Sequence, residues 1–253
     1  MSDATRLDDK VVLIVGGAGA IGAEAAALLA SLGARVVITH TPGDAKADAA
    51  AQIIKLLPGE DHAALPADVA DTPTILALRD AVEARYGRLD MLVNAAGFTS
   101  AVPHADLDAL TDDMIDRIFA VNWRGQFAVV RAFAPLLKAS GDGLIVNLSS
   151  IAAFTGVGSS IAYCAAKAGI DVMTRSLARA LAPEVRVLAV SPGVVDTGFV
   201  PGRGADFNAK TSATLPLRRI ATAHDVALAI VACATHLPYS TGHIIQVDGG
   251  RAL

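Results

Sequence analysis

The sequence predicts an α/β protein in which one doubly wound parallel sheet carries helices on both faces. Short runs of Val, Ile and Leu alternate with longer alanine-rich amphipathic segments, as in strand–helix units that bury a parallel sheet on both sides. Hydrophobic residues make up 53% of the chain and aromatic residues only 4%, which fits aliphatic strands packed against alanine-rich helices. No repeat, low-complexity tract or Ser/Pro-rich linker divides the 253 residues, so a single domain over 1–253 is expected.

Seven strands are expected where the apolar runs are short. These runs are rich in Val, Ile and Leu and are bounded by turn residues, which distinguishes them from the longer helical segments. The expected strands are 11–15, 35–39, 62–66, 90–94, 143–148, 185–190 and 244–247.

The segments between the strands show helix start and stop signals. Asp44 is expected to cap a helix over 45–57, and Thr72 begins a helical segment that runs to Gly87. Further helices are expected over 21–32, 107–120, 124–139, 160–181 and 223–236.

One long stretch, about 194–215, is expected to be irregular. It contains Gly198, Pro201, Gly202 and Gly204, which do not favour a continuous helix or strand. Loops of this length in compact domains are usually functional or mobile. We therefore expect this stretch to form a lid over a substrate site.

Charge and hydropathy exclude several classes of protein. The net charge is −4 with an isoelectric point near 5.8, and no run of Lys or Arg is present, so neither nucleic acid nor anionic lipid is expected as a partner. The mean hydropathy is +0.48, but Glu24 and the Pro183-to-Arg186 segment interrupt the long apolar stretches. No membrane span is therefore expected. The acidic, polar start MSDATRLDDK is unlike a signal peptide and favours a cytoplasmic location.

No metal site is expected. Only Cys164 and Cys233 are present, which is too few for a disulfide framework or a cysteine-based metal site. The six histidines show no paired spacing of the kind that binds zinc.

A glycine-rich turn follows the first expected strand. VVLIV leads directly into Gly16-Gly17-Ala18-Gly19-Ala20-Ile21-Gly22 and then into a helical pattern. In this context backbone N–H groups and a helix N-terminus can face a pyrophosphate, as in a Rossmann-type dinucleotide site. A tight glycine turn without a ligand is the alternative reading.

Tyr163 and Lys167 are one helical turn apart, so they share a face of the helix expected over 160–181. An ammonium group in that position can lower the pKa of the phenol. This spacing is compatible with acid–base catalysis by the tyrosine, and also with an ordinary surface pair.

Further short motifs follow one another in a fixed order. They are Asp68-Val69, Asn94-Ala95-Ala96-Gly97, Val121-Asn122, Asn147-Leu148-Ser149-Ser150, Ser191-Pro192-Gly193 through Thr197, and Thr241-Gly242 with Val247-Asp248-Gly249-Gly250. Together with the glycine turn and the Tyr/Lys pair, they make nearly the whole chain resemble a short-chain dehydrogenase/reductase. The branch that it resembles includes 3-oxoacyl-carrier-protein reductases and many alcohol and sugar dehydrogenases.

The resemblance implies four catalytic residues. Tyr163 matches the acid/base that exchanges a proton with the substrate oxygen, and Lys167 matches the residue that holds the nicotinamide ribose and acidifies the phenol. Ser150 matches the serine that orients the carbonyl, whereas its neighbour Ser149 has no such role. Asn122 matches the asparagine that holds a water in the proton relay; a structural role, capping a helix irregularity, is the alternative.

The resemblance also implies a set of cofactor contacts. Asp68 matches the side chain that meets the adenine, and Asn94 and Gly97 match the turn beside the adenosine ribose. The full expected set is Gly16, Ala18, Ala20, Ile21, Gly22, His40, Thr41, Asp68, Val69, Asn94, Ala95, Gly97, Tyr163, Lys167, Pro192, Gly193, Val195 and Thr197.

The end of the second strand bears on which cofactor is used. NAD-preferring relatives usually carry Asp where this chain has His40, and that carboxylate would repel a 2′-phosphate. His40, Thr41 and Lys46 offer hydroxyl and cationic groups instead, although Gly19 stands where many NADP enzymes carry Arg. NADP(H) is therefore favoured over NAD(H).

The resemblance implies an NAD(P)(H)-dependent oxidoreductase that acts on a ketone/secondary alcohol pair. A non-catalytic nucleotide sensor on the same fold is one alternative. A methyltransferase is another, but it would need an acidic residue at the position that His40 occupies. The substrate is expected to be a small molecule whose pocket involves residues near 98–104, 151–160 and 194–215. A carrier protein is not favoured as a partner, because the helices ending near Ser140 and Pro183 lack the expected arginines.

A homotetramer is expected, because the family usually assembles in this way. The helices near 107–139 and 160–181 and the C-terminal segment are the expected interfaces.

Overall fold

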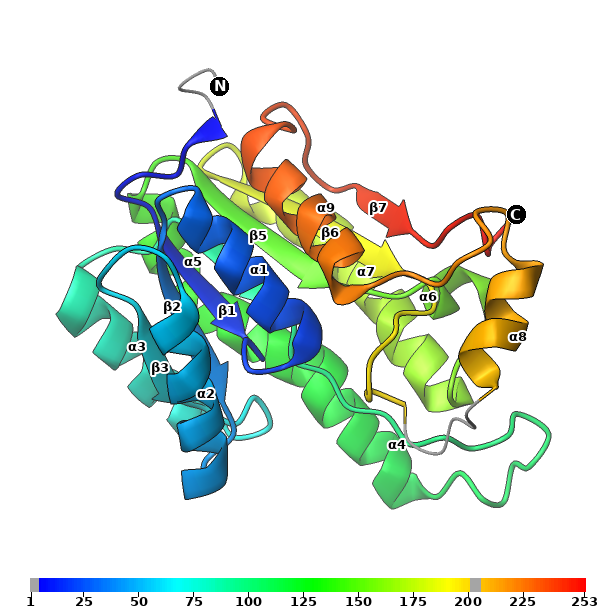
Figure 1. Cartoon of the computed structure of the whole chain (residues 1–253). Coiled ribbons are helices and arrows are strands. Elements are labelled where there is room, and N and C mark those ends of the chain that lie inside the picture. The colour runs from blue at the N-terminus through cyan, green and yellow to red at the C-terminus, as the bar shows by residue number, and fades with distance from the viewer. Residues whose placement is uncertain (1–4, 201–205) are drawn as a thin grey trace.

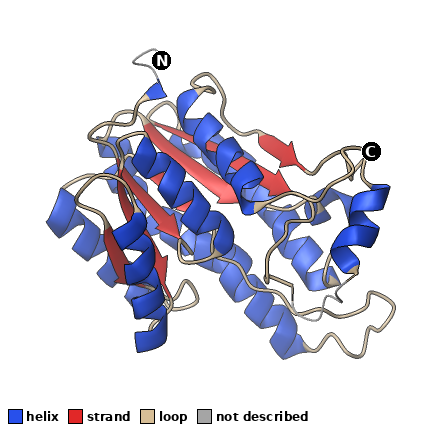
Figure 2. Ribbon diagram, in the orientation of Figure 1, coloured by secondary structure: helices blue, strands red, loops and turns tan. Residues whose placement is uncertain are grey.

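The computed structural model describes residues 5–200 and 206–253, which form seven parallel strands between two layers of helices (Figures 1 and 2). All seven expected strands are confirmed. Two of them extend further than expected, β2 to His40 and β6 to Pro192. The strands are β1 Val11–Val15, β2 Arg35–His40, β3 Ala63–Pro66, β4 Met91–Asn94, β5 Gly143–Leu148, β6 Val185–Pro192 and β7 Ile244–Val247.

The sheet has the order β3-β2-β1-β4-β5-β6-β7. β1 pairs with β2 on one side and with β4 on the other, so the direction of winding reverses at β1. Ligands of doubly wound sheets bind in the crevice beyond the carboxyl ends of the strands at such a reversal. Val15 pairs with Asn94, and Asn94 with Asn147, so the loops after β1, β4 and β5 leave the sheet at one edge.

The core has two layers, one on each side of the sheet. Val11, Leu13 and Val15 pack toward α3, α5 and α7, while Val12 and Ile14 pack toward α1, α2 and α9. Both faces of β1 are therefore buried, which explains why its sequence is apolar without alternation. The helices are α1 Ala20–Ser31, α2 Asp44–Leu56, α3 Thr72–Tyr86, α4 Asp112–Phe119, α5 Gln126–Ala139, α6 Ala152–Thr155, α7 Ile161–Leu181, α8 Phe207–Thr214 and α9 Ala223–Thr235.

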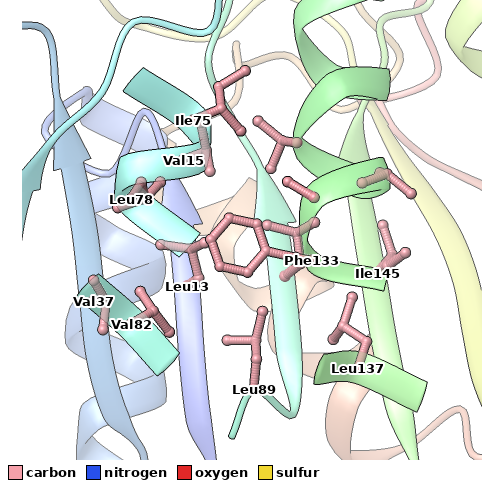
Figure 3. Packing of buried hydrophobic residues seen from close by; sticks show 14 of the residues in the cluster. Leu13, Val15, Val37, Ile75, Leu78, Val82, Leu89, Phe133, Leu137 and Ile145 are labelled. Carbon is pink, nitrogen blue, oxygen red and sulfur yellow. The ribbon is translucent and has the colours of Figure 1, made fainter. Parts of the chain in front are cut away.

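Phe133 of α5 lies at the centre of the first layer. Its ring is fully buried and lies among Leu13 of β1, Leu89 and Leu137 (Figure 3). This packing fixes α5 against the strands whose ends carry the glycine turn and the loop after β4.

Two expected helix starts were wrong. Asp44 does not cap α2, because the helix begins at Asp44 itself and Gly43, with a φ of 129°, takes the preceding position. α4 begins at Asp112 and not at residue 107, because the Thr111 side chain accepts a hydrogen bond from Met114 N and so caps the helix. In both cases an acidic residue lies in the first turn, where it favours the positive end of the helix.

The expected irregular stretch at 194–215 was partly wrong, because it contains α8. Pro201, Gly202 and Gly204 lie outside the described residues. The short helix α6 was also not expected. No helix within the described residues is long and apolar enough to cross a membrane.

Candidate active site

The glycine turn between β1 and α1 is held by β2. Thr39 Oγ1 accepts from Gly16 N at 2.9 Å, and the Thr39 carbonyl accepts from Ala18 N at 3.3 Å. Gly16 has a φ of +81°, and a Cβ on it would lie 2.6 Å from Ala96 N. Only glycine fits there, because the turn must pass close to the loop after β4.

The first turn of α1 is built to face an anion. Gly19 precedes the helix without a side-chain cap, and the first turn contains no acidic residue. The N–H groups of Ala20, Ile21 and Gly22 have no partner inside the helix, and all three residues line a cavity. This arrangement fits the pyrophosphate of a dinucleotide.

Tyr163 and Lys167 are placed by the start of α7. Ser160 precedes the helix and its hydroxyl accepts from Tyr163 N at 3.2 Å, which fixes the first turn. One turn later, Lys167 Nζ lies 5.6 Å from the centre of the Tyr163 ring. The spacing seen in the sequence therefore does bring the ammonium group to the phenol.

Lys167 is fully buried, and this burial lowers its pKa from 10.5 to about 8. Asp171, one turn further along α7, opposes the effect by its negative charge. The ammonium group donates to the Leu148 carbonyl at 2.7 Å, at the end of β5. The side chain is thus locked in place, and its charge is easier to lose than that of an exposed lysine.

The two serines after β5 have different surroundings. Ser150 Oγ accepts from Ala152 N at 3.2 Å, which leaves the hydroxyl proton free to be donated into the cavity. Ser149 Oγ donates to Asp171 Oδ1 at 2.5 Å instead. Burial raises the pKa of Asp171, and this hydrogen bond works against that rise.

Asn122 lies in a π-helical segment, Ala120–Gly125, that joins α4 to α5. Its side-chain nitrogen donates to the carbonyls of Phe98 at 2.7 Å and Ile118 at 2.8 Å, and its Oδ1 accepts from Phe98 N at 3.3 Å. The asparagine thus ties the irregular helix to the loop after β4. This is the structural role that the sequence left open, and the relay role remains a prediction.

A cavity of about 770 Å³ runs along the carboxyl edge of the sheet. The glycine turn lines one part of it, and Ser150, Tyr163 and Lys167 line another. The expected residues that line it are Gly16, Ala20, Ile21, Gly22, Ala95, Gly97, Ser150, Tyr163, Lys167, Pro192, Gly193, Val195 and Thr197.

Seven expected residues do not line this cavity: Ala18, His40, Thr41, Asp68, Val69, Asn94 and Asn122. Several of them have other partners. His40 is buried, and its Nδ1 lies 2.9 Å from the Thr41 carbonyl. Asp68 accepts from Ala70 N at 2.8 Å, and Val69 packs in the core.

Asn94 joins a buried polar chain. Its Nδ2 donates to Asn147 Oδ1 at 3.0 Å, and Asn147 Nδ2 donates to Thr174 Oγ1 at 3.0 Å. Asn94 Oδ1 is buried and has no hydrogen-bond partner among the residues that the structure describes. Such an orphaned acceptor is expected to take a bond from a water or a ligand group.

Sequence reasoning did not name several side chains of the cavity wall, among them Phe199, Phe207 and Arg251. The Phe199 ring lies 6.1 Å from that of Tyr163, centre to centre. Phe199 and Phe207 fall in the stretch expected to shape the pocket, so the sequence indicated their region. Nothing in the local pattern around Arg251 indicated that it would reach the same cavity.

The comparisons with known proteins agree with this arrangement. The sequence profile of a family described as enoyl-(acyl carrier protein) reductase matches residues 16–252. A granaticin polyketide synthase protein of Streptomyces violaceoruber, described as a ketoacyl reductase, is 39% identical over 249 residues, covering 96% of each chain. The cis-4-hydroxycyclohexanecarboxylate dehydrogenase of Sinomonas cyclohexanicum is 38% identical over 246 residues, with 96% of each chain covered. The crystal structure of levodione reductase superposes with a TM-score of 0.89 at 26% identity, covering 98% of this chain and 99% of that one.

Proposed function

Because the chain belongs to the short-chain dehydrogenase/reductase family, which acts on alcohol and ketone groups with a nicotinamide cofactor, we propose that Tyr163 is its acid/base. The observation that carries the proposal is the cavity that joins the glycine turn to Ser150, Tyr163 and Lys167. The oxygen of the ketone or secondary alcohol would lie at the hydroxyl groups of Ser150 and Tyr163.

The cofactor is assigned to the glycine-turn side of the cavity. The uncapped N-terminus of α1 would hold the pyrophosphate, and Lys167 with the loop from Pro192 to Thr197 would hold the nicotinamide half. When bound, a nicotinamide cofactor supplies or accepts a hydride. The orphaned Asn94 Oδ1 is a further acceptor near this edge, at the end of β4.

Proton transfer to the substrate oxygen involves Tyr163 and Lys167 of α7 and Ser150 of the loop after β5. In the direction of reduction, Tyr163 donates its phenolic proton to the developing alkoxide, and Ser150 donates a hydrogen bond to the same oxygen. The charge on Lys167 stabilises the phenolate that remains. The hydrogen bond from Lys167 to Leu148 keeps that charge beside the ring.

We further propose a preference for NADP(H). No carboxylate stands at the end of β2, where His40 and Thr41 would meet the 2′ position of the ribose. A 2′-phosphate would therefore meet the Thr41 hydroxyl and no like charge at this position.

The substrate is proposed to be a free small molecule. The last turn of α5 has Lys138 as its basic residue and that of α7 has Arg179, which is a sparse surface for an acidic carrier protein. Because one relative is named for a ring alcohol that bears a carboxylate, ring ketones and alcohols are included in the substrate panel below.

The experiment is a panel of ketones and secondary alcohols with both cofactors, followed by nicotinamide absorbance. Tyr163→Phe should lower kcat by about a hundredfold or more, because the transferable proton is lost, while cofactor binding persists. Tyr239→Phe, a fully exposed tyrosine, is the matched control. Cofactor binding without turnover of any substrate would favour the sensor, and a Tyr163→Phe variant that kept a tenth of kcat would refute the role of the tyrosine.

A further inference from the structure

Arg251 is an unexpected cation in the active-site cavity. Among the described residues that line the cavity, the charged ones are Lys167 and Arg251, and none is Asp or Glu. Lys167 is buried and already bonded to the Leu148 carbonyl. Arg251 is exposed to solvent while it lines the cavity, which places it at the mouth.

The guanidinium group of Arg251 is available for a ligand. No Asp or Glu within the described residues forms an ion pair with it. Asp248, the nearest acidic side chain along the sequence, accepts from Gly250 N with one carboxylate oxygen and from Ala252 N with the other, both at 2.9 Å. Arg251 therefore forms no ion pair with the acidic side chain of its own turn.

The same Asp248 bonds hold the C-terminal turn in a fixed position. Arg251 lies between the two anchored N–H groups, and its own N–H donates to the Asp248 carbonyl at 3.2 Å. The turn is also tied to the rest of the chain, because Leu217 N donates to the Gly249 carbonyl at 3.2 Å. An arginine on an anchored turn loses less conformational entropy when it binds an anion than an arginine on a mobile segment does.

The rest of the wall is largely hydrocarbon. Phe199, Phe207, Val157, Val200 and Ile151 line the cavity together with Tyr163 and Ser150. Phe207 is the first residue of α8, and Figure 1 shows the C-terminus at the same end of the molecule as α8. The cavity thus combines apolar walls, two hydroxyl groups for a carbonyl oxygen and one unpaired guanidinium group.

We propose that the substrate is an oxo or hydroxy acid whose carboxylate pairs with Arg251 while its reacting oxygen lies at Tyr163 and Ser150. A carboxylate matches the planar fork of a guanidinium group through two parallel hydrogen bonds. This assignment rests on the proposed function for the position of the reacting oxygen, but the pairing of Arg251 with a carboxylate is testable without turnover.

The first experiment measures binding. Cyclohexanecarboxylate and the neutral cyclohexanecarboxamide are titrated into the cofactor-loaded protein and followed by calorimetry. The carboxylate should bind about tenfold more tightly than the carboxamide, because only the carboxylate forms an ion pair with Arg251. The expected difference is modest, since an ion pair at an exposed cavity mouth is only partly desolvated. Arg251→Met should abolish that difference, and Arg251→Lys should restore part of it.

The control variant is Arg79→Met, since Arg79 lies on α3 and does not line the cavity. It should leave the difference between the two probes unchanged. Equal affinity for both probes in the wild type, including no measurable binding of either, would overturn the proposal. So would a loss of cofactor affinity in Arg251→Met with the difference between the probes retained, since Arg251 would then serve the cofactor phosphates.

The second experiment measures turnover of 4-oxocyclohexanecarboxylate and its methyl ester. Arg251→Met should lower kcat/KM for the acid about tenfold more than for the ester, mainly through KM. Equal losses for both compounds would overturn the assignment of substrate class. Selective binding of the carboxylate probe with no turnover of any ketone would support the Arg251 site and refute the proposed function.

Discussion

Lys167 shows how burial sets the chemistry of a single residue. Its ammonium group is fully buried and its pKa falls to about 8, so the side chain is charged below that pH and neutral above it. The charged form is the one that stabilises the Tyr163 phenolate. We therefore expect kcat/KM for reduction to fall as the pH rises through about 8.

Asp171→Asn tests the origin of this pH dependence. Its negative charge raises the pKa of Lys167, so its removal should move the falling limb to lower pH. The amide can still accept the hydrogen bond from Ser149, which keeps the packing of α7. A wild-type profile that stays flat through about pH 8, or a limb that Asp171→Asn leaves in place, would contradict the role of Lys167.

His40 is the residue on which cofactor choice is expected to depend. His40→Asp should shift the ratio of kcat/KM values toward NAD by about tenfold, because a carboxylate repels the 2′-phosphate and accepts from a 2′-hydroxyl. The measurement is kcat/KM for both cofactors in both proteins. A wild type already tenfold better with NAD would show that the preference is reversed.

Gly19 offers a second variant with the opposite effect. A Cβ on Gly19 would lie 3.3 Å from the Gly16 carbonyl oxygen, which requires a small shift of the turn, and the φ of −80° suits any residue. If the turn makes this shift, Gly19→Arg should strengthen NADP binding through a new guanidinium–phosphate contact. An unchanged ratio of kcat/KM for the two cofactors would indicate that the 2′ position of the adenosine ribose lies away from this turn.

The segment after β6 is expected to close over the cavity. Thr197, Gly198, Phe199 and Val200 line the cavity, and Phe199 packs beside Tyr163. Hydrogen exchange over 194–200 and α8 should slow when cofactor is added, since ordering a lid protects its amides. The α3 amides serve as the internal reference. A segment that is equally protected with and without cofactor would count against a lid.

The positions of the strands were predicted more accurately than the boundaries of the helices. Strands such as VVLIV were located correctly because complete burial leaves a continuous apolar run. The start of α4 was wrong, although Thr111 followed by Asp112 and Asp113 was a readable start signal. α8 gave a weaker signal: Asp206 precedes it but makes no capping hydrogen bond, and no apolar stripe marks it, because Thr211 is its one buried residue.

Exposed apolar side chains on α7 indicate that the protein self-associates. Val172 is 60% exposed and Ile161 43%, although both lie on a helix that otherwise packs against the sheet. The homotetramer expected for this family would cover them. Sedimentation should give a tetramer mass at micromolar concentration, and a monomer mass would refute the prediction.

Val172→Glu tests which face associates. A charge buried in the interface should split the tetramer into smaller species. Leu56→Glu is the matched control, because Leu56 is 83% exposed at the end of α2, away from the expected interfaces. Dissociation caused by both variants would indicate a general loss of stability instead of a specific interface on α7.

The features that could be predicted from the sequence are those that depend on neighbours along the chain. The seven strands, the glycine turn before α1 and the alignment of Tyr163 with Lys167 follow from local periodicity, because a strand or one helical turn fixes which residues share a face. Contacts between distant segments could not be predicted in this way and were found only in the folded chain. Asn122 bonds to the loop after β4, Ser149 bonds to Asp171, and Arg251 enters the cavity of Tyr163. These contacts join segments that the strand order brings to one edge of the sheet, and strand order is set by the packing of the whole core, which no local pattern records.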